Sequence, residues 1–285
     1  MTSKKAPVGA LLIHGLTGNP TEMKVVSRFL EDKGYATATP LLPGHGGGHE
    51  ELLAATAEDW LQGLRTEFNK AQEEWEEVFV VGLCASSVLA ALLAAEDTRV
   101  RGIVLLSSHY GMVNPEISLR QKLLPIGFLL PRSLRKRFYW TEKPPYGIKD
   151  KRMQDIITAA IEAEKSNRET KDHGTFRTYL QSLYEMERLV GQLKKKVHNV
   201  KCPALLIHSV EDTWFTIENS IKLCEDLGSE DKSVLLINNC NHVMTVDLRK
   251  FEVARQIESF IDKYSQRGIA ARQEELLRKA RSEAA

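Results

Sequence analysis

The chain contains no apolar run that approaches the ~20 residues needed by a membrane-spanning helix. Its 285 residues carry a net charge of only +1, which gives no general attraction to nucleic acid. It has four cysteines, and no two of them form the C-x-x-C pair typical of zinc and dithiol redox motifs. We therefore expect a soluble, cytoplasmic protein with no cofactor, no metal and no nucleic-acid partner.

Hydrophobic residues make up 42% of the chain and charged residues 27%, as in an ordinary globular protein. Short apolar runs predict strands at residues 8–14, 35–39, 78–83, 102–107, 204–209 and 234–237. Apolar residues at helical spacing predict helices at residues 22–33, 58–75, 86–95, 218–227 and 246–264. This alternation predicts an α/β fold with a doubly wound, mostly parallel sheet.

The alternation stops between about residues 110 and 190, where the helix signal is strong and the strand signal weak. We expect residues 1–110 and 195–265 to form the core domain. Residues 111–194 would then form an inserted helical cap or lid. Residues 266–285 are rich in Arg, Glu and Ala and predict a charged helical tail.

The predicted strand at 78–83 runs into the sequence G-L-C-A-S at residues 82–86 and then into a small-residue helix. A strand, a sharp turn and a helix are the setting of a nucleophile elbow, whose pattern is G-x-S-x-G. Cys84 would occupy the apex, where the helix N-terminus favours a thiolate. Ser86 and Ser87 are alternative nucleophiles beyond the apex, and Cys84 could also be a small core residue.

Two further strand ends supply the partners of a catalytic triad in the order nucleophile, acid, histidine. Asp212 follows the strand at 204–209, and His242 follows the strand at 234–237. His242 would accept the thiol proton and return it to the leaving group, while Asp212 would fix the imidazole tautomer. Glu211 is the alternative acid, and either carboxylate could be an ordinary loop residue.

The sequence H-G-L-T-G at residues 14–18 follows the first predicted strand. Such a turn would place the N–H of Leu16 beside that of Ala85 to form an oxyanion hole, although its glycines could serve the turn alone. Trp214 and Phe215 follow Asp212 directly, and Phe128 lies in the cap. These three aromatic residues are candidates for an acyl pocket.

Three stretches together resemble the bacterial carboxylesterases and monoacylglycerol lipases of the α/β-hydrolase superfamily. They read L-L-I-H-G-L-T-G-N at 11–19, L-P-G-H-G at 42–46 and N-H-V-M-T-V-D at 241–247. The resemblance extends over nearly the whole chain outside the cap. It implies hydrolysis of acyl esters or monoacylglycerol-like substrates by Cys84, Asp212 and His242, with Leu16 and Ala85 as oxyanion donors and no cofactor.

The chain departs from this family at two positions of the elbow. Cys84 stands where these esterases carry Ser, and Ser86 stands where they carry Gly. A cysteine in this turn is similar to the elbow of dienelactone hydrolases, polyhydroxyalkanoate synthases and some thioesterase-like acyltransferases. That similarity keeps acyltransferase or thioesterase action on acyl thioesters open, beside a third possibility of a non-catalytic binding protein.

The predicted cap joins an apolar core at 123–130 to a set of basic residues, with no acid between Arg120 and Arg137. The basic residues are Arg120, Lys122, Arg132, Arg135, Lys136 and Arg137. They could meet an acyl carrier or a lipid surface, or belong to a solvated helix with an ordinary buried face. The substrate itself would be a small-molecule acyl ester or thioester.

Overall fold

Six parallel strands form the central sheet in the order β2-β1-β3-β4-β7-β8, which confirms the α/β class. A computed structural model describes residues 6–111, 124–165 and 176–283. The strands are β1 (Ala6–Ile13), β2 (Ala36–Ala38), β3 (Trp75–Leu83), β4 (Val100–Leu106), β7 (Ala204–Ser209) and β8 (Lys232–Ile237). All six run in one direction, so their carboxyl ends share one edge of the sheet.

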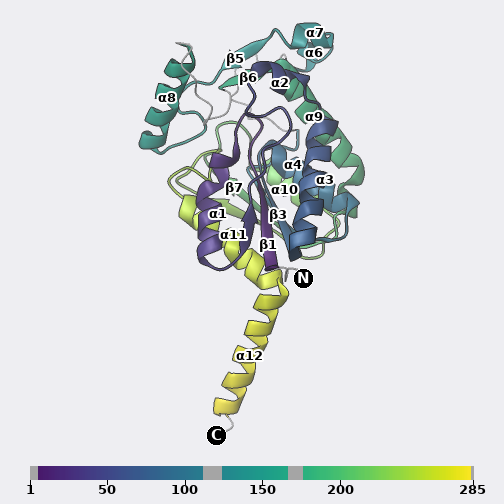
Figure 1. The fold of residues 1–285 in the computed structure, drawn as a ribbon, viewed down its shortest axis with the longest axis vertical. Helices are drawn as coiled ribbons and strands as arrows, with labels where there is room; N and C mark the ends of the chain where they lie inside the picture. The colour runs from purple at the N-terminus through teal and green to yellow at the C-terminus, as the bar shows by residue number, and fades with distance from the viewer. Residues whose placement is uncertain (1–5, 112–123, 166–175, 284–285) are drawn as a thin grey trace.

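Helices cover both faces of this sheet (Figure 1). On one face α1 (Lys24–Asp32) packs against α11 (Lys250–Tyr264). On the other lie α3 (Ala57–Glu74), α4 (Ala85–Glu96) and α9 (Leu180–Lys196). The shorter elements around this framework are η1 (Pro20–Met23), α2 (His49–Ala54), η2 (Val197–Asn199) and α10 (Glu218–Asp226).

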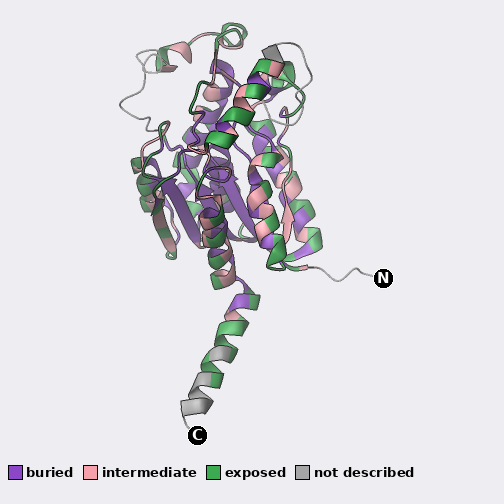
Figure 2. Ribbon diagram, turned by 90° about the vertical axis from the view of Figure 1, so that its left-hand side faces the viewer, coloured by how far each residue is buried: buried purple, intermediate pink, exposed green. Residues whose placement is uncertain are grey.

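Alternate side chains of each central strand enter different apolar layers. In β1, Leu11 belongs to the layer beneath α3, α4 and α9, whereas Leu12 belongs to the layer beneath α1 and α11. Val80 and Val81 of β3 divide in the same way. Both faces are therefore buried, as a parallel sheet requires, and the central strands appear as buried ribbons in Figure 2.

Two predicted helix boundaries were wrong, each for a tertiary reason. Residue 75 was expected to end a helix, but Trp75 pairs with Ala6 and begins β3, with its ring lying over Gly9. The last core helix was expected from residue 246 but begins at Lys250. The preceding turn is held by the Asp247 carboxylate, which accepts hydrogen bonds from several backbone N–H groups.

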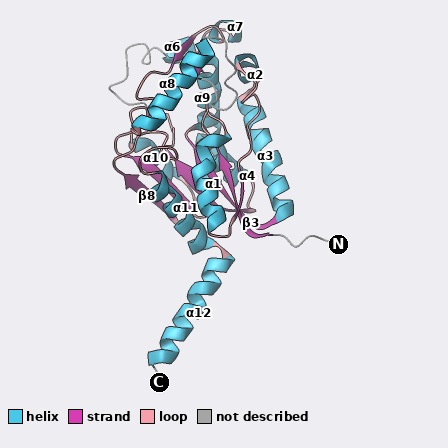
Figure 3. Cartoon of the chain, turned by 60° about the vertical axis from the view of Figure 1, so that its left-hand side comes forward, coloured by secondary structure: helices cyan, strands magenta, loops and turns pink. Residues whose placement is uncertain are grey.

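The segment between β4 and α9 contains α6 (Leu124–Gly127), α7 (Arg132–Arg135) and α8 (Lys151–Lys165) above the carboxyl edge of the sheet (Figure 3). It also contains a small antiparallel pair, β5 (Tyr139–Thr141) and β6 (Arg177–Tyr179), which the weak strand signal did not predict. Although α9 begins inside the expected cap, it packs on α4, and its inward residues belong to the core: Met186, Leu189, Val190 and Leu193.

The last helix, α12 (Gln266–Glu283), projects away from the body of the protein on the side opposite the cap (Figures 1 and 3). Most of its described surface is exposed (Figure 2). None of the helices in the described ranges has the length and apolar character needed to cross a membrane.

Gly82 and Gly191 give a matched pair of substitutions that tests the packing at the elbow. A Cβ at residue 82 would lie 2.1 Å from the carbonyl oxygen of Ser86, whereas one at residue 191 would meet nothing within 4 Å. We expect Gly82→Ala to lower the free energy of unfolding by about 3 kcal/mol or more. Gly191→Ala, inside α9, should raise it by about 0.5–1 kcal/mol. Urea denaturation measures both, and a Gly82→Ala protein as stable as the wild type would contradict the described approach.

Candidate active site

Cys84 lies between the end of β3 and the start of α4, with φ of 55° and ψ of −116°. A non-glycine residue with this backbone is strained and persists only where its surroundings hold it. The N–H of Cys84 donates to the carbonyl of Leu106 at 2.9 Å, which anchors the turn to the neighbouring strand. The side chain is 7% exposed at the N-terminus of α4, a position that favours an anion.

Ser86 and Ser87 are fully buried, and their hydroxyls are engaged by backbone carbonyls. The Ser86 hydroxyl donates to the carbonyl of His14 at 2.5 Å, and that of Ser87 donates to the carbonyl of Cys84 at 2.6 Å. A serine therefore fits at residue 86, where the elbow pattern has glycine, and its hydrogen bond to His14 joins the elbow to the loop after β1. Of the three candidate nucleophiles, Cys84 is the one at the apex.

The Nδ1 of His242 lies 2.7 Å from Oδ2 of Asp212, and both side chains are buried. The other carboxylate oxygen accepts the N–H groups of Trp214 at 2.8 Å and Phe215 at 3.0 Å. Burial opposes the charge on Asp212, but the imidazole and these hydrogen bonds lower its pKa below the ordinary value. Asp212 is therefore an anion held in one orientation against the imidazole.

Burial alone would lower the pKa of His242, but the charges of Asp212 and Cys84 outweigh it and raise that pKa. The Nε2 atom is buried, and the imidazole interacts with the Cys84 side chain through charge and hydrogen bonding. Because Nδ1 is occupied by Asp212, Nε2 is the atom free to exchange a proton with Cys84 or a bound substrate.

Glu211, the alternative acid, is exposed and pairs with Lys149, whereas the carboxylate that binds His242 is that of Asp212. A second imidazole, that of His208, lies beside Asp212. The Nε2 of His208 is 3.5 Å from Asp212 and 3.2 Å from the carbonyl of Phe215. Burial lowers the pKa of His208, which favours a neutral ring that supports the acid's position.

The loop that carries His242 is held by two buried side chains. The Asn241 Oδ1 accepts the N–H groups of Thr213 and His242, which joins the acid loop to the histidine loop. The Asp247 carboxylate accepts the N–H of Asn241 at 2.6 Å and that of Lys149 at 2.9 Å. The cap segment and the histidine loop therefore share one anchor.

The loop after β1 contains Leu16, which was predicted to be an oxyanion donor together with Ala85. The N–H groups of Leu16 and Ala85 donate to no acceptor within the described ranges. His45 Nε2 donates to the Leu16 carbonyl at 2.7 Å, and His14 Nε2 accepts the N–H of Leu42 at 3.2 Å. Burial lowers the pKa of His14 to about 3, so it stays neutral and structural. Two unoccupied N–H donors beside Cys84 suit a developing oxyanion.

Comparison with protein families matches residues 5–249 to the family described as serine aminopeptidase, S33. The chain belongs to the S33 family. Its relatives include a thermostable monoacylglycerol lipase of Bacillus sp. strain H-257, 26% identical over 259 residues, with 90% of this chain and 92% of that protein covered. A carboxylesterase of Bacillus subtilis strain 168 is 21% identical, with 92% of this chain and 95% of that protein covered.

Solved structures agree on the α/β-hydrolase fold. A structure of the metagenome-derived lipolytic enzymes LipS and LipT is similar with a TM-score of 0.73 and 25% identity, covering 92% of this chain and 96% of its own. A monoglyceride lipase from Saccharomyces cerevisiae has a TM-score of 0.76 at 15% identity, covering 93% and 90%. The family is named for a serine, whereas this chain has Cys84 at the apex of the elbow.

The three aromatic residues expected at the acyl pocket of this S33 protein do not share one place. The rings of Trp214 and Phe215 lie 4.5 and 5.3 Å from that of His242, centre to centre. Phe128 contacts Tyr184 in the cap region, with ring centres 5.9 Å apart. Trp214 and Phe215 thus border the reactive imidazole, whereas Phe128 has no ring contact with the triad among the described residues.

Two carboxyl groups that the sequence did not single out lie beside the loop after β1 (residues 14–18), which we call the oxyanion loop. Glu22 accepts the N–H of Gly15 at 2.8 Å, and Glu142 accepts the hydroxyls of Thr17 at 3.3 Å and Thr178 at 3.4 Å. Burial raises the pKa of both carboxyls to about 7, and Glu22 raises that of Glu142 further by its charge. They lie 120 positions apart in the chain, so no local pattern could have paired them.

The basic residues of the cap divide into two groups. Arg132 donates to the carbonyls of Leu53 and Ala54, and Arg135 donates to carbonyls of its own segment while lying over the Tyr184 ring. These two are structural. Arg137 is exposed and Lys136 is partly exposed, in the same segment as the exposed apolar side chains Ile126 and Leu129. The predicted Arg120 and Lys122 lie outside the described residues.

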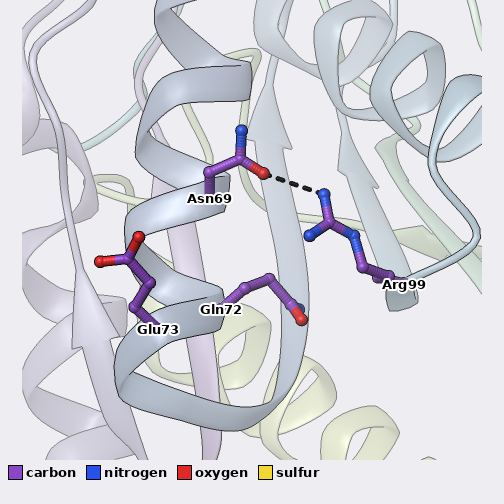
Figure 4. Close-up of a pocket in the computed structure, with 4 residues that line it drawn as sticks. All are labelled: Asn69, Gln72, Glu73 and Arg99. Atoms are coloured by element: carbon purple, nitrogen blue, oxygen red, sulfur yellow. Dashed lines mark hydrogen bonds between the residues drawn. The ribbon is translucent and has the colours of Figure 1, made fainter.

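Away from this site, Asn69, Gln72, Glu73 and Arg99 line an open surface pocket (Figure 4). In it, Asn69 accepts a hydrogen bond of 2.9 Å from Arg99. Arg99 precedes β4, so the pocket lies at the amino ends of the strands, opposite Cys84. The described residues form no cluster of three or more metal-ligating side chains.

The raised pKa of Glu22 predicts a stability change with a definite sign. Its folded pKa of about 7 exceeds the ordinary 4.5, so its contribution is full below pH 4.5 and is lost as the pH rises through 7. Glu22→Gln removes the buried charge, and we expect it to stabilise the protein by about 1–3 kcal/mol at pH 8. At pH 5 that gain should largely vanish.

Thermal or urea unfolding at the two pH values measures this difference. Glu74→Gln, at the exposed end of α3, is the matched control and should behave like the wild type at both. A Glu22→Gln protein that is less stable at pH 8 than the wild type would contradict the buried-carboxyl description.

Proposed function

We propose that the protein hydrolyses carboxylic esters, such as acyl esters or monoacylglycerol-like substrates, through an acyl-enzyme on Cys84. One observation carries the proposal: a strained elbow presents Cys84 to a buried imidazole whose Nδ1 is held by Asp212 and which interacts with the Cys84 side chain. The monoacylglycerol lipase and carboxylesterase among the relatives support this class of substrate.

In the first half-reaction, the thiol passes its proton to Nε2 of His242, and the sulfur attacks the ester carbonyl. The N–H groups of Leu16 and Ala85 receive the charge on the tetrahedral oxygen. The C–O bond then breaks, and His242 returns the proton to the departing alcohol. In the second half-reaction, water gives a proton to His242 and attacks the thioester, after which the sulfur leaves and regains the proton.

Acyl transfer or thioester cleavage is the second candidate, and Cys84 itself favours it. The intermediate on a cysteine is a thioester, and a thioester passes its acyl group to amines, alcohols or thiols as well as to water. The triad and the oxyanion donors would serve either outcome without change. Product analysis with acyl thioesters and added acceptors separates the two, since release of free acid alone would exclude transfer.

The exposed tip of the cap supports a lipid surface as the place where substrate is met. Ile126 and Leu129 are 63% and 85% exposed, and close to them in the sequence Arg137 is exposed and Lys136 partly exposed. Apolar side chains with a basic rim suit an interface that carries negative charge. Arg132 and Arg135 would keep this tip attached to the core rather than contact the lipid.

Replacing the nucleophile tests the catalytic proposal. We expect Cys84→Ala to lower kcat/KM for p-nitrophenyl acyl esters by at least about 10³-fold, because no covalent intermediate can form. Cys240→Ala is the control. Its thiol is buried, with a pKa raised by that burial to about 11, and its loss should leave turnover near the wild-type rate. Equal turnover by the Cys84→Ala protein would refute the acyl-enzyme.

Alkylation gives a second test that distinguishes an enzyme from a binding protein of the same fold. We expect iodoacetamide at neutral pH to modify Cys84 first, because its sulfur stands at the apex of the elbow beside the general base His242. Burial raises the pKa of Cys202 to about 12 and also raises that of Cys224, so these thiols should react slowly. Peptide mapping gives the order, and a Cys84 no faster than free cysteine would favour the binding protein.

A further inference from the structure

The end of β4 carries a second strained turn, next to the elbow. Ser107 follows β4 directly and has a φ of 46°. Because Leu83 pairs with Leu106, Ser107 is the neighbour of Cys84 across the sheet, about 5 Å away. The Ser107 hydroxyl donates to the carbonyl of His242 at 2.6 Å. This turn is therefore fixed against the loop that carries the triad histidine.

The two residues after Ser107 carry buried polar atoms that have no hydrogen-bond partner in the described ranges. One is the hydroxyl of Ser108, which is fully buried, and the other is Nδ1 of His109, which is 1% exposed. A buried polar group without a partner destabilises the folded protein, and a bound molecule that supplies the partner removes that cost. Two such groups in adjacent residues point to a ligand.

The other nitrogen of His109 is engaged. Its Nε2 lies 2.5 Å from Oε1 of Glu187, a residue of α9. A carboxylate can only accept, so Nε2 carries the hydrogen, and the neutral ring then has a lone pair on Nδ1. Glu187 is thus a positioning residue, because it selects the tautomer in which Nδ1 is an acceptor.

The ring of His109 lies close to the triad. It packs on the ring of Phe215, with centres 4.4 Å apart and planes at 35°. The same phenyl ring lies 5.3 Å from the ring of His242, centre to centre. Both imidazoles therefore contact Phe215, and His109 borders the site from the β4 side.

The roles proposed for the triad and the oxyanion donors leave one direction for the acyl chain. The carbonyl oxygen would turn to Leu16, on the β1 side of β3, and the departing alcohol would turn to Nε2 of His242. Because β4 lies on the side of β3 opposite β1, the acyl chain is left to extend over the end of β4. His109 lies at that end.

We propose that His109 is a specificity-determining residue whose Nδ1 accepts a hydrogen bond from a hydroxyl group on the acyl chain of the substrate. The proposal rests on the ester hydrolysis proposed above and narrows its acyl group to hydroxyacyl chains. One strand spacing and two residues separate Cys84 from His109, a reach of at most about 12 Å. A hydroxyl on the third to the sixth carbon of the chain falls within that reach.

Three pairs of esters, each matched in shape with a methyl group in place of the hydroxyl, test the preference by the ratio of their kcat/KM values. The acyl pairs are 4-nitrophenyl 3-hydroxybutanoate with 3-methylbutanoate, and 6-hydroxyhexanoate with heptanoate. The alcohol pair is 2,3-dihydroxypropyl butanoate with 2-methylbutyl butanoate. For the wild type we expect the hydroxylated member of at least one acyl pair to be favoured by about threefold to tenfold, the amount that one neutral hydrogen bond supplies.

Substitution of His109 should remove this preference. His109→Phe keeps a ring against Phe215 but has no acceptor, so the ratio should fall to one or below. His109→Asn keeps a polar atom two bonds from Cβ, where Nδ1 stands, and should retain more of the ratio than His109→Phe. A ratio at or below one for the wild type in both acyl pairs would overturn the proposal, as would a preference confined to the alcohol pair. Equal losses on both members would also overturn it, because His109 would then act through the triad.

The positioning role of Glu187 has its own test. Glu187→Ala should lower the ratio by about twofold or more, because Nε2 loses its acceptor and the tautomer is no longer selected. Glu187→Gln should restore the ratio, since its amide oxygen can accept the same hydrogen. Lys195→Ala, at an exposed position of the same helix, is the control and should leave the ratio unchanged. An equal ratio for Glu187→Ala and the wild type would contradict this role.

A binding measurement separates this proposal from the proposed reaction. The probes are the N-propyl amides of the same four acids, titrated calorimetrically into the wild type and Cys84→Ala. In at least one pair the hydroxylated amide should bind about threefold or more tightly, and His109→Phe should remove the difference. If none of the esters is cleaved, ester hydrolysis fails, and the titration still decides the role of His109. Equal affinity within both pairs, or no binding of any amide, would overturn it.

Discussion

The backbone of Cys84, held at a positive φ between a strand and a helix, is the constraint around which the site is arranged. That geometry lifts the side chain to the carboxyl edge of the sheet and aims the α4 N-terminus at it. It also requires Gly82, because the carbonyl of Ser86 occupies the space of a side chain there. The Ser86 hydroxyl then fixes the oxyanion loop relative to the elbow, because it donates a hydrogen bond to the carbonyl of His14.

The loops that carry Asp212 and His242 meet this elbow because all six strands are parallel and end at the same edge of the sheet. The Asp212–His242 hydrogen bond unites two of these loops, and Asn241 fixes their relative position through the N–H of Thr213. Asp247 extends the same network to the cap at Lys149. The cap is therefore attached to the loops that carry Asp212 and His242, and Glu142 joins it to the loop after β1 through the hydroxyl of Thr17.

Much of this arrangement could be predicted from the sequence, because the informative features are local. An apolar strand followed by a small-residue turn and helix marks Cys84, and polar loops after two late strands mark Asp212 and His242. The parallel sheet then brings such loops together without further information. Ser86 shows the limit of a pattern, since its departure from glycine gave no hint that its hydroxyl would bind His14.

The remainder depends on contacts between distant segments, which no period or spacing reveals. Glu22 resembled the start of an ordinary helix, and Glu142 lay among cap residues with no distinct pattern. Trp75 fits the helical spacing of the residues before it, but it belongs to β3 because it pairs with Ala6 of β1. The packing of α9 on α4 likewise follows from the tertiary fold, so the division between cap and core could not be read from helix signals alone.

The account's central claim is that Cys84 carries the acyl group during turnover. Intact-mass spectrometry of the protein, quenched in acid during reaction with a panel of acyl esters and thioesters, tests it directly. We predict a mass increase of one acyl group, lost on treatment with neutral hydroxylamine and mapped to the peptide that contains Cys84. An acyl group found on Ser86, Ser87 or another residue, or steady turnover by a protein with Cys84 alkylated, would contradict the account.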